Sequence, residues 1–322
     1  GPPRTKMRLT SLKGVFVGSG SEGLQQPEVV TEILSLAGTA PTELNVLYIG
    51  TPTYEKAQSR ENQTKLLAAA GCSVTHLKTT LAGDCTAVEM EEACAAANII
   101  VVSGGNTLYG IDRWRATGLD RQLKAAGERG ALLCGGSAGA ICWFDGGHSD
   151  SGDPDTYISS AAAPAPAGAD EATTFAEGGV AAQWDYVRCP GLGFLPGLCC
   201  PHFDKTQSNG VLRAHDFDEM MLRHPGERGV CIDHFAALIV DGARYRVLSL
   251  PGKPGSVLGG AFSEARAGLP GVWVKEVAGG EVKTWLAPAD GSLDELLREP
   301  TAVVEDRRLA AIRAANPSPK EL

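Results

Sequence analysis

The feature that most constrains the fold is a run of very small residues around one serine, Gly135-Gly136-Ser137-Ala138-Gly139. Its spacing is that of a nucleophile elbow, a sharp turn from a strand into a helix that leaves a serine side chain accessible. Larger side chains beside the serine would collide with the strand or the helix. The pattern therefore predicts a strand that ends before Ser137, a helix that begins after it, and a serine available for chemistry.

The flanking residues have the composition that such a turn needs. Residues 131–134 are a short apolar run after a charged segment with helical spacing, and residues 140–144 are apolar again. The turn would also point the backbone N–H of Ala138 toward the place where negative charge develops on a substrate carbonyl. The alternative is that the small residues only let a helix pack closely on a strand, as in many α/β domains without activity.

Short apolar segments alternate with segments of helical length along residues 13–232. This alternation predicts a doubly wound, mostly parallel sheet flanked by helices. The clearest strands are expected at residues 14–17, 45–49, 99–102 and 131–134, and the clearest helices at residues 28–36, 55–70 and 86–97. Ligands bind at the carboxyl ends of the strands in such sheets, so the turns at Gly104 and Ser137 are predicted to form two walls of a site.

The pattern changes to antiparallel hairpins after residue 236. One hairpin is expected from residues 237–240 and 245–248, another from 272–275 and 282–285, and a capping box at Ser292 predicts a C-terminal helix. Residues 159–182, rich in Ala, Gly and Pro, are predicted to form a surface insertion. We expect one domain over residues 1–322, with a core at about 13–250 and an extension at 251–322.

The composition argues against several classes of partner. The formal net charge is −9 and the pI is near 5.2, so nucleic acid and anionic membranes are not expected partners. The sequence has no run of 18 apolar residues and no apolar secretory signal at its start, and we expect a cytoplasmic location. The nine cysteines lie mostly in apolar surroundings, which predicts buried thiols in a reducing compartment.

Two patterns suggest a cofactor or a metal, and neither is expected to hold one. Residues 18–23 fit G-x-G-x-x-G, but Pro27 delays the following helix, and the strand at residues 45–49 is not followed by an acidic residue. Cys199-Cys200 lies beside His202, but no C-x-x-C pair accompanies it. We therefore predict no organic cofactor and no metal.

Histidines at two predicted strand ends are candidates for proton transfer. A serine nucleophile needs an imidazole within hydrogen-bond reach, and His202, after an apolar run and a proline, is the main candidate. Asp233 and His234 follow another apolar run, and either could accept the Nδ1–H of that imidazole. The alternatives are a histidine satisfied by local backbone and a solvated turn. Four other histidines lie in less suitable contexts: His76, His148, His215 and His224.

Together these segments resemble the peptidase E and cyanophycinase family of serine peptidases, whose fold is similar to that of class I glutamine amidotransferases. The resemblance covers roughly residues 13–250 and rests on the order and combination of five blocks. They are Ser103-Gly104-Gly105-Asn106-Thr107, Gly135-Gly136-Ser137-Ala138-Gly139-Ala140, Cys142-Trp143-Phe144-Asp145, Leu195-Pro196-Gly197 with Pro201-His202-Phe203-Asp204, and Ile232-Asp233-His234 leading into Ala237-Leu238.

The resemblance implies roles for single residues. Ser137 would be the nucleophile, His202 the general base and acid, and the N–H groups of Gly105 and Ala138 the oxyanion hole. Asn106 would line the substrate pocket. The sequence departs from the family at the third catalytic position, where the family usually places Glu, Asp or Asn and this chain has His234.

That departure leaves two alternatives for the third member. Either His234 accepts the hydrogen bond as a neutral group, or a shift of one residue lets Asp233 do so. A neutral acceptor would stabilise the imidazolium less than a carboxylate would.

By resemblance, the expected substrate is a small peptide, most plausibly an Asp-X dipeptide or a related aspartyl amide, cleaved through an acyl-enzyme. The cationic residues near the family blocks are Arg113, Arg115, Arg188 and Lys205. Two alternatives remain: a cyanophycinase-like or detoxifying amide hydrolase of the same family, and a binding protein that has lost catalysis. A homodimer is the family-like expectation.

Overall fold

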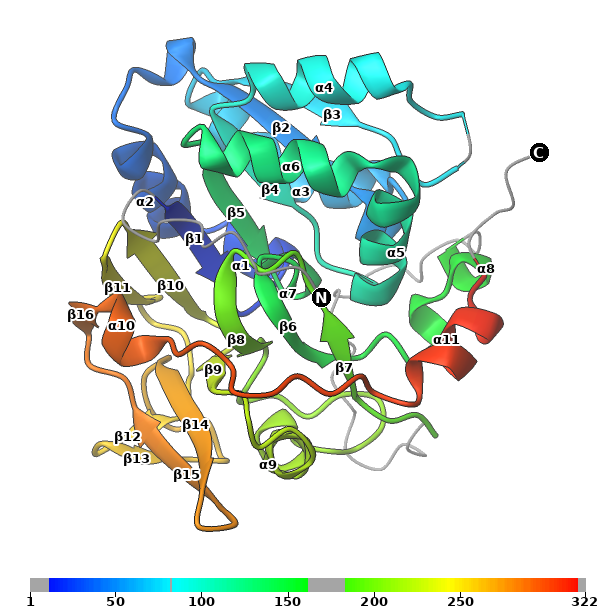
Figure 1. Cartoon of the computed structure of the whole chain (residues 1–322). Coiled ribbons are helices and arrows are strands. Elements are labelled where there is room, and N and C mark those ends of the chain that lie inside the picture. The colour runs from blue at the N-terminus through cyan, green and yellow to red at the C-terminus, as the bar shows by residue number, and fades with distance from the viewer. Residues whose placement is uncertain (1–11, 82, 162–182, 318–322) are drawn as a thin grey trace.

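Two β-sheets form the centre of the computed structural model, which describes residues 12–81, 83–161 and 183–317 (Figure 1). The strands of the first sheet, in chain order, are β1 Lys13–Val17, β2 Asn45–Ile49, β3 Ser73–Leu77, β4 Ile99–Val102, β5 Leu132–Gly136, β10 Ala236–Asp241, β11 Arg244–Ser249 and β16 Asp290–Ser292. Their order in the sheet is β16-β11-β10-β1-β5-β4-β2-β3. The run from β1 to β3 is parallel, and β10, β11 and β16 add antiparallel strands at one side.

The second sheet has the order β15-β14-β9-β8-β6-β7. Its strands are β6 Phe144–Ser149, β7 Val187–Pro190, β8 Leu195–Cys200, β9 Gly229–Ile232, β14 Val272–Ala278 and β15 Glu281–Leu286. β6, β8 and β9 pair in parallel, whereas β7, β14 and β15 are antiparallel to their neighbours. A short separate ribbon consists of β12 Val257–Leu258 and β13 Ala261–Phe262.

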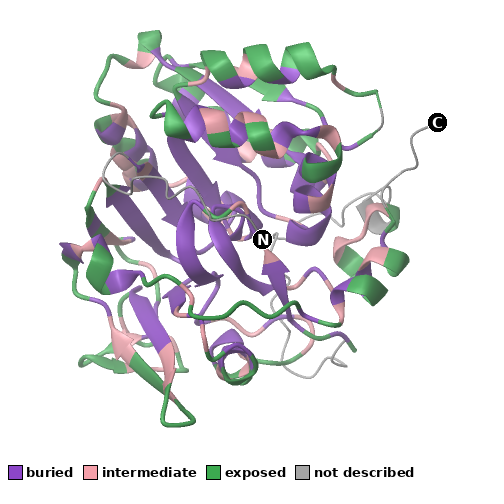
Figure 2. Ribbon diagram, in the orientation of Figure 1, coloured by how far each residue is buried: buried purple, intermediate pink, exposed green. Residues whose placement is uncertain are grey.

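Helices cover both faces of the first sheet. The helices of the described chain are α1 Ser21–Leu24, α2 Pro27–Ala37, α3 Ala57–Ala69, α4 Ala87–Ala96, α5 Thr107–Thr117, α6 Leu119–Glu128, α7 Ala138–Ile141, α8 Ile158–Ala161, α9 Arg213–Arg223, α10 Leu293–Leu296 and α11 Leu309–Ala315, and not all of them contact the first sheet. Alternate strand residues face opposite sides: Val15 and Val101 pack with α2 and α3, whereas Phe16 and Ile100 pack with α4, α5 and α6. Burial on both faces explains the continuous apolar runs of these strands (Figure 2).

The second sheet is also covered on both faces. Cys199, Val230 and Ile232 join the main core, while Leu198 and Cys231, on the other face, pack with the buried side of α9. The two sheets therefore share one continuous core, and the loops that leave their parallel strands lie close together.

The predicted fold class is confirmed, and several element bounds agree closely. The strands at 45–49 and 99–102 have the predicted bounds, and the predicted helices at 28–36, 55–70 and 86–97 correspond to α2, α3 and α4. Both predicted hairpins are present. The capping box at Ser292 forms, but the helix it opens, α10, is only four residues long.

One feature of the fold was not predicted from the sequence, and one predicted feature lies mostly outside the described residues. The alternation of strands and helices gave no sign that β6, β8 and β9 leave the first sheet and form a second one. Most of the predicted insertion at residues 159–182 lies outside the described residues.

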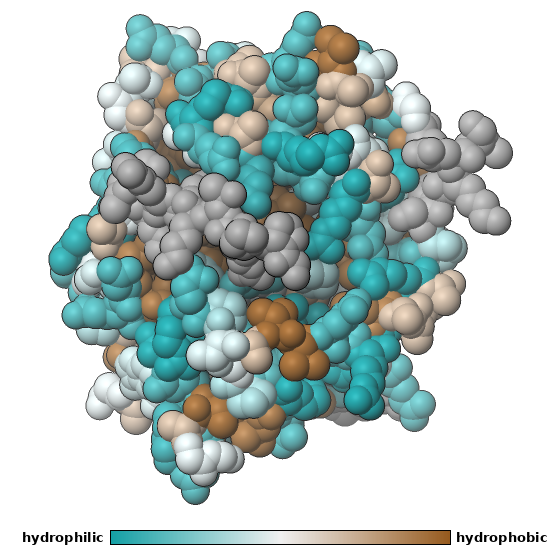
Figure 3. Space-filling model, in the orientation of Figure 1, coloured by the Kyte–Doolittle hydropathy of each residue, from teal (hydrophilic) through white to brown (hydrophobic). Residues whose placement is uncertain are grey.

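The surface is largely hydrophilic on the face seen in Figure 3, with small separate apolar areas. The large apolar side chains that are at least half exposed in the described chain are Leu81, Val88, Leu258, Leu269 and Val304. Among the described residues, no helix combines the length and the apolar character needed to cross a membrane.

Candidate active site

The candidate site lies where five strands end. The loops that follow β1, β4 and β5 of the first sheet meet the loops that follow β8 and β9 of the second sheet. The backbone N–H of Ser137 donates to the carbonyl of Val17 (3.2 Å), and that of His202 donates to the carbonyl of Gly18 (3.0 Å). Since consecutive Cα atoms are about 3.8 Å apart, the end of β1 holds both residues at one place.

Ser137 forms the sharp turn between β5 and α7. Its backbone has φ 55° and ψ −122°, a conformation that residues other than glycine rarely adopt. A Cβ on Gly136 would lie 2.1 Å from the carbonyl oxygen of Ser19, and one on Gly139 would lie 2.1 Å from that of Val102. Both glycines are therefore required because neighbouring backbone approaches so closely.

Gly105 and Ala138 lie at the starts of two helices beside the serine. Gly105 has φ 101° and precedes Asn106, the N-cap of α5, while Ala138 is the first residue of α7. In the described part of the chain, neither backbone N–H donates to a protein group. Free backbone N–H groups at the start of a helix can bind an anion. The contact of Gly139 with Val102 brings the two helix starts together.

His202 and His234, which we call the histidine pair, face each other directly. The Nδ1 atoms of the two rings are 2.7 Å apart, and both side chains are buried. The backbone N–H of His234 donates to the Asp204 carboxylate (2.7 Å), and its carbonyl accepts from the Ser19 hydroxyl (2.7 Å). The structure thus brings His202 and His234 together, as one of the two sequence alternatives requires.

Burial favours the neutral form of both histidines. Burial lowers the pKa of His202 well below its ordinary value, and the nearby His234 and Arg213 add to this effect. Burial also lowers the pKa of His234, against the opposing effect of a carboxylate on its Nε2. That carboxylate belongs to Glu22, which forms a hydrogen bond with His234 Nε2. The same hydrogen bond lowers the pKa of Glu22, so the carboxylate is ionised.

Asp233, the other sequence candidate for the third position, points elsewhere. Its carboxylate accepts hydrogen bonds from the N–H groups of Ser256 and Gly271 (both 2.9 Å) and lies 2.7 Å from the Ser256 hydroxyl. Burial, followed by the charge of Asp204, raises the pKa of Asp233 to about 7. Its side chain thus ties the turn after β9 to the loop at residue 256 instead of to His202.

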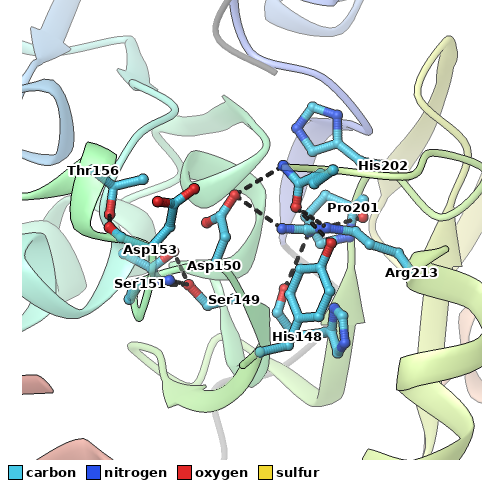
Figure 4. Close-up of polar contacts among 12 residues, drawn as sticks. His148, Ser149, Asp150, Ser151, Asp153, Thr156, Pro201, His202 and Arg213 are labelled. Atoms are coloured by element: carbon cyan, nitrogen blue, oxygen red, sulfur yellow. Dashed lines mark hydrogen bonds and ion pairs between the residues drawn. The ribbon is translucent and has the colours of Figure 1, made fainter. Parts of the chain in front are cut away.

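A buried arginine supports the backbone behind His202 (Figure 4). Arg213, on α9, donates through its guanidinium to the carbonyls of Pro201 (3.0 Å) and His148 (3.3 Å). It also forms an ion pair with Asp150 (3.1 Å). His202 has φ 49°, a backbone conformation that residues other than glycine rarely adopt. The hydrogen bond from Arg213 to the Pro201 carbonyl helps to hold this conformation.

Asn106 is engaged within the protein. Its side-chain oxygen caps α5 by accepting from the Tyr109 N–H (3.0 Å), and its amide donates to the Thr156 hydroxyl (2.8 Å) and the Ser151 carbonyl (3.3 Å). It joins the start of α5 to the loop after β6. Its contact with a substrate stays a prediction.

Other histidine and arginine candidates bond to groups outside the histidine pair. His148 bonds to Asp216 and His215 to Glu264. The buried Arg188 forms a two-pronged ion pair with Glu227, while Arg113 and Arg115 donate to backbone carbonyls.

An open groove lies beside the histidine pair. Its volume is about 420 Å³, and Lys205, Arg266 and Asp204 are among its lining residues. The Lys205 N–H donates to the His202 carbonyl (2.9 Å), and Arg266 bonds to Asp204 (2.6 Å). The groove therefore carries charges of both signs, because Glu264 and His215, which bond to each other, also line it.

Glu22 is the site residue that the sequence analysis did not identify. It lies in α1, in the glycine-rich segment after β1 that fits a dinucleotide motif. Residues 18–23 fit that motif as a phosphate loop, whereas the structure has α1 there, one short helical turn before Pro27. The available signal was an acidic side chain in a loop at the carboxyl end of a central strand.

Comparison with known proteins adds a family and a fold. The sequence matches the profile described as Peptidase family S51 over residues 15–248. A Trypanosoma brucei brucei protein named G2/mitotic-specific cyclin-1 is 32% identical over 341 residues, which cover 98% of this chain and 96% of that protein. The name cyclin is that of the relative. The family of the present chain is given by the peptidase profile, which spans more than half of it.

Two solved structures share the fold. A crystal structure of a peptidase from an acI-B1 Actinobacterium has a TM-score of 0.54 at 18% identity and covers 87% of this chain and 96% of its own. A peptidase E protein from Listeria monocytogenes EGD-e has a TM-score of 0.51 at 16% identity and covers 74% of this chain and 98% of its own. At these identities the likeness is one of fold.

Proposed function

The chain belongs to peptidase family S51, and on this premise we propose that it is a serine peptidase in which Ser137 is the nucleophile and His202 the general base. The observation that carries the proposal is the conformation of Ser137, with φ 55° and ψ −122° between β5 and α7. Strain of this kind persists only where the surroundings enforce it, and it is typical of a nucleophile elbow.

The proposed reaction has two halves. Ser137 Oγ attacks the carbonyl carbon of the substrate while its proton passes to His202 Nε2, and the N–H groups of Gly105 and Ala138 bind the resulting oxyanion. The C–N bond then breaks, and His202 gives the proton to the leaving amine. Water, deprotonated by His202, cleaves the acyl ester and restores Ser137.

His234 takes the third position in this proposal. Its Nδ1 lies 2.7 Å from His202 Nδ1, whereas the Asp233 carboxylate is engaged with Ser256 and Gly271. A ring nitrogen that accepts the Nδ1–H of His202 fixes the tautomer whose Nε2 is free to take a proton.

The proposed substrate is a small peptide with an acidic residue, namely an Asp-X dipeptide or a related aspartyl amide. The support is the groove beside His202, whose lining includes the carboxylates of Asp204 and Glu264 and also the cations Lys205 and Arg266. Charge-assisted hydrogen bonds from such groups recognise a carboxylate well.

The test measures the release of free amino acid from a panel of dipeptides that contains Asp-X, X-Asp, neutral and β-aspartyl members. Wild type is compared with Ser137→Ala and with the control Ser35→Ala, a serine on the exposed side of α2. We expect cleavage of Asp-X alone and a loss of roughly 10⁴-fold or more in Ser137→Ala only.

A fluorophosphonate probe separates the other outcomes. Labelling of Ser137 without cleavage of the panel would indicate a hydrolase with another substrate, such as a cyanophycin-like amide. If neither labelling nor cleavage occurs, the peptidase proposal is wrong and a binding protein with this fold is favoured.

A further inference from the structure

We propose that Glu22 is a positioning residue, whose carboxylate fixes through His234 the proton arrangement that makes His202 a general base. The inference rests on the proposed function. Three segments that are far apart in the sequence supply the three groups: Glu22, in α1, follows β1, His202 follows β8 and His234 follows β9. Glu22 contacts His234 Nε2, and His234 Nδ1 contacts His202 Nδ1, so the three side chains form a continuous hydrogen-bonded chain.

The protons of this chain can be assigned from one end. Ionised Glu22 only accepts hydrogen bonds, so His234 must carry its proton on Nε2. A neutral imidazole that is protonated on Nε2 has a bare Nδ1, which can only accept. The proton between the two Nδ1 atoms therefore belongs to His202, and His202 Nε2 is left bare, as a general base requires.

Without the carboxylate, the opposite arrangement becomes available. His234 could then carry its proton on Nδ1 and donate it to His202 Nδ1. His202 would hold its own proton on Nε2, where it could not accept one from Ser137. Glu22 thus selects between a basic and a non-basic form of the same two rings.

The carboxylate also matters once charge forms. When His202 Nε2 takes the serine proton, the pair carries one positive charge, and the Nδ1 proton can move across 2.7 Å to His234. No atom is gained or lost in this step, and Glu22 stays ionised beside the new imidazolium. Glu22 and His234 together thereby take the place of the carboxylate that a serine peptidase usually bonds directly to its histidine.

Several cations nearby make this compensation necessary. The charged groups that act on the pair and on Glu22 are Lys205, Arg213, Lys253, Arg266 and Asp204. Three of the cations, Lys205, Arg213 and Arg266, oppose a positive charge on His202. Within the described residues, the Glu22 carboxylate bonds to a ring of the pair, whereas the Asp204 carboxylate bonds to the His234 backbone N–H and to Arg266.

The test is Glu22→Gln, because the amide keeps the size of the side chain but can donate as well as accept. Glu28→Gln, six residues along at the start of α2, removes the same charge and serves as the control. We expect kcat in Glu22→Gln to fall roughly tenfold to a hundredfold with KM unchanged. The acid limb of kcat/KM should shift, because the pair loses the carboxylate that stabilises its charged form.

A second readout does not depend on turnover. Nitrogen NMR of histidine-labelled protein should show His234 protonated on Nε2 in wild type and a mixture of tautomers in Glu22→Gln. His234 protonated on Nδ1 in the folded wild type would overturn the inference, as would Glu22→Gln with wild-type kcat and pH profile. If instead Ser137 is neither labelled nor needed for cleavage, the proposed function fails, while the NMR measurement still decides the role of Glu22.

Discussion

The elbow at residues 135–139 and the histidine pair come from different sheets and are held in different ways. The elbow is fixed by backbone: Ser137 N–H bonds to Val17, and neighbouring carbonyl oxygens occupy the space where Gly136 and Gly139 would carry side chains. The histidine pair is fixed by side chains of three separate segments, through hydrogen bonds that depend on where protons and charges lie.

This difference has a mechanical consequence. The elbow depends on steric fit, so a disturbance there should change the stability of the fold together with the activity. The pair depends on electrostatics, so a disturbance there should change turnover and its pH dependence while the fold remains. Substitutions in the two regions can test whether the separation is real.

Gly136→Ala should have the largest effect. The new Cβ would lie 2.1 Å from the Ser19 carbonyl oxygen, in the loop that leads to Glu22, so backbone must move. We expect the free energy of unfolding to fall by about 3 kcal/mol or more in urea denaturation, at the upper end of the cost of overpacking, with activity lost.

Gly130→Ala is the control for this substitution. Gly130 has φ 98° but nothing within 4 Å of an added Cβ, so Ala there should cost only the backbone strain of about 1 to 2 kcal/mol. If Gly136→Ala costs no more than Gly130→Ala, close approach of backbone is not what the elbow requires.

The elbow could be predicted because its demand is local. The four residues around Ser137 are all glycine or alanine, which indicates that nothing larger than a methyl group fits beside the serine, and the apolar segments on either side form the strand and the helix. The parallel strands could be predicted for the same reason, since burial on both faces leaves a continuous apolar run in the sequence.

The histidine pair could be predicted only in part. Glu22 and His234 are 212 residues apart, and no local pattern records their contact. The choice between Asp233 and His234 also depends on a distant element: Ser256 and Gly271 bind the Asp233 carboxylate and turn it away from His202. Hydrogen bonds between separate loops leave little trace in a single sequence.

His234→Ala compared with Asp233→Asn is the next test in order of effect. The alanine removes the acceptor of the His202 Nδ1–H, and we expect kcat to fall about a hundredfold, while circular dichroism still shows a folded chain. Asp233→Asn keeps the shape of a side chain that faces Ser256, and kcat should change by less than about threefold. Equal losses in the two variants would mean that the turn after β9 acts as one structural unit and that His234 has no separate role.

The smallest effect concerns pH and stability. Burial raises the pKa of Asp233 to about 7 from its ordinary value of 3.8, so the folded chain binds this proton more tightly than the unfolded chain does. The resulting stability is fully present below about pH 4 and is lost as the pH rises through about 7. The free energy of unfolding should therefore fall between pH 5 and pH 8.

Asp233→Asn tests this contribution because the amide resembles the protonated carboxyl. Its oxygen can accept from the N–H groups of Ser256 and Gly271, and its nitrogen can donate to the Ser256 hydroxyl. In urea denaturation at pH 5 and pH 8, we expect the fall in unfolding free energy to be smaller than in wild type by about 1 to 2 kcal/mol. Asp155→Asn, at an exposed position, is the control. If the unfolding free energy of Asp233→Asn falls as much as that of wild type, Asp233 does not hold a proton in the folded chain. If it falls less and turnover is intact, Asp233 serves the structure of the turn, and the proton chemistry belongs to His234.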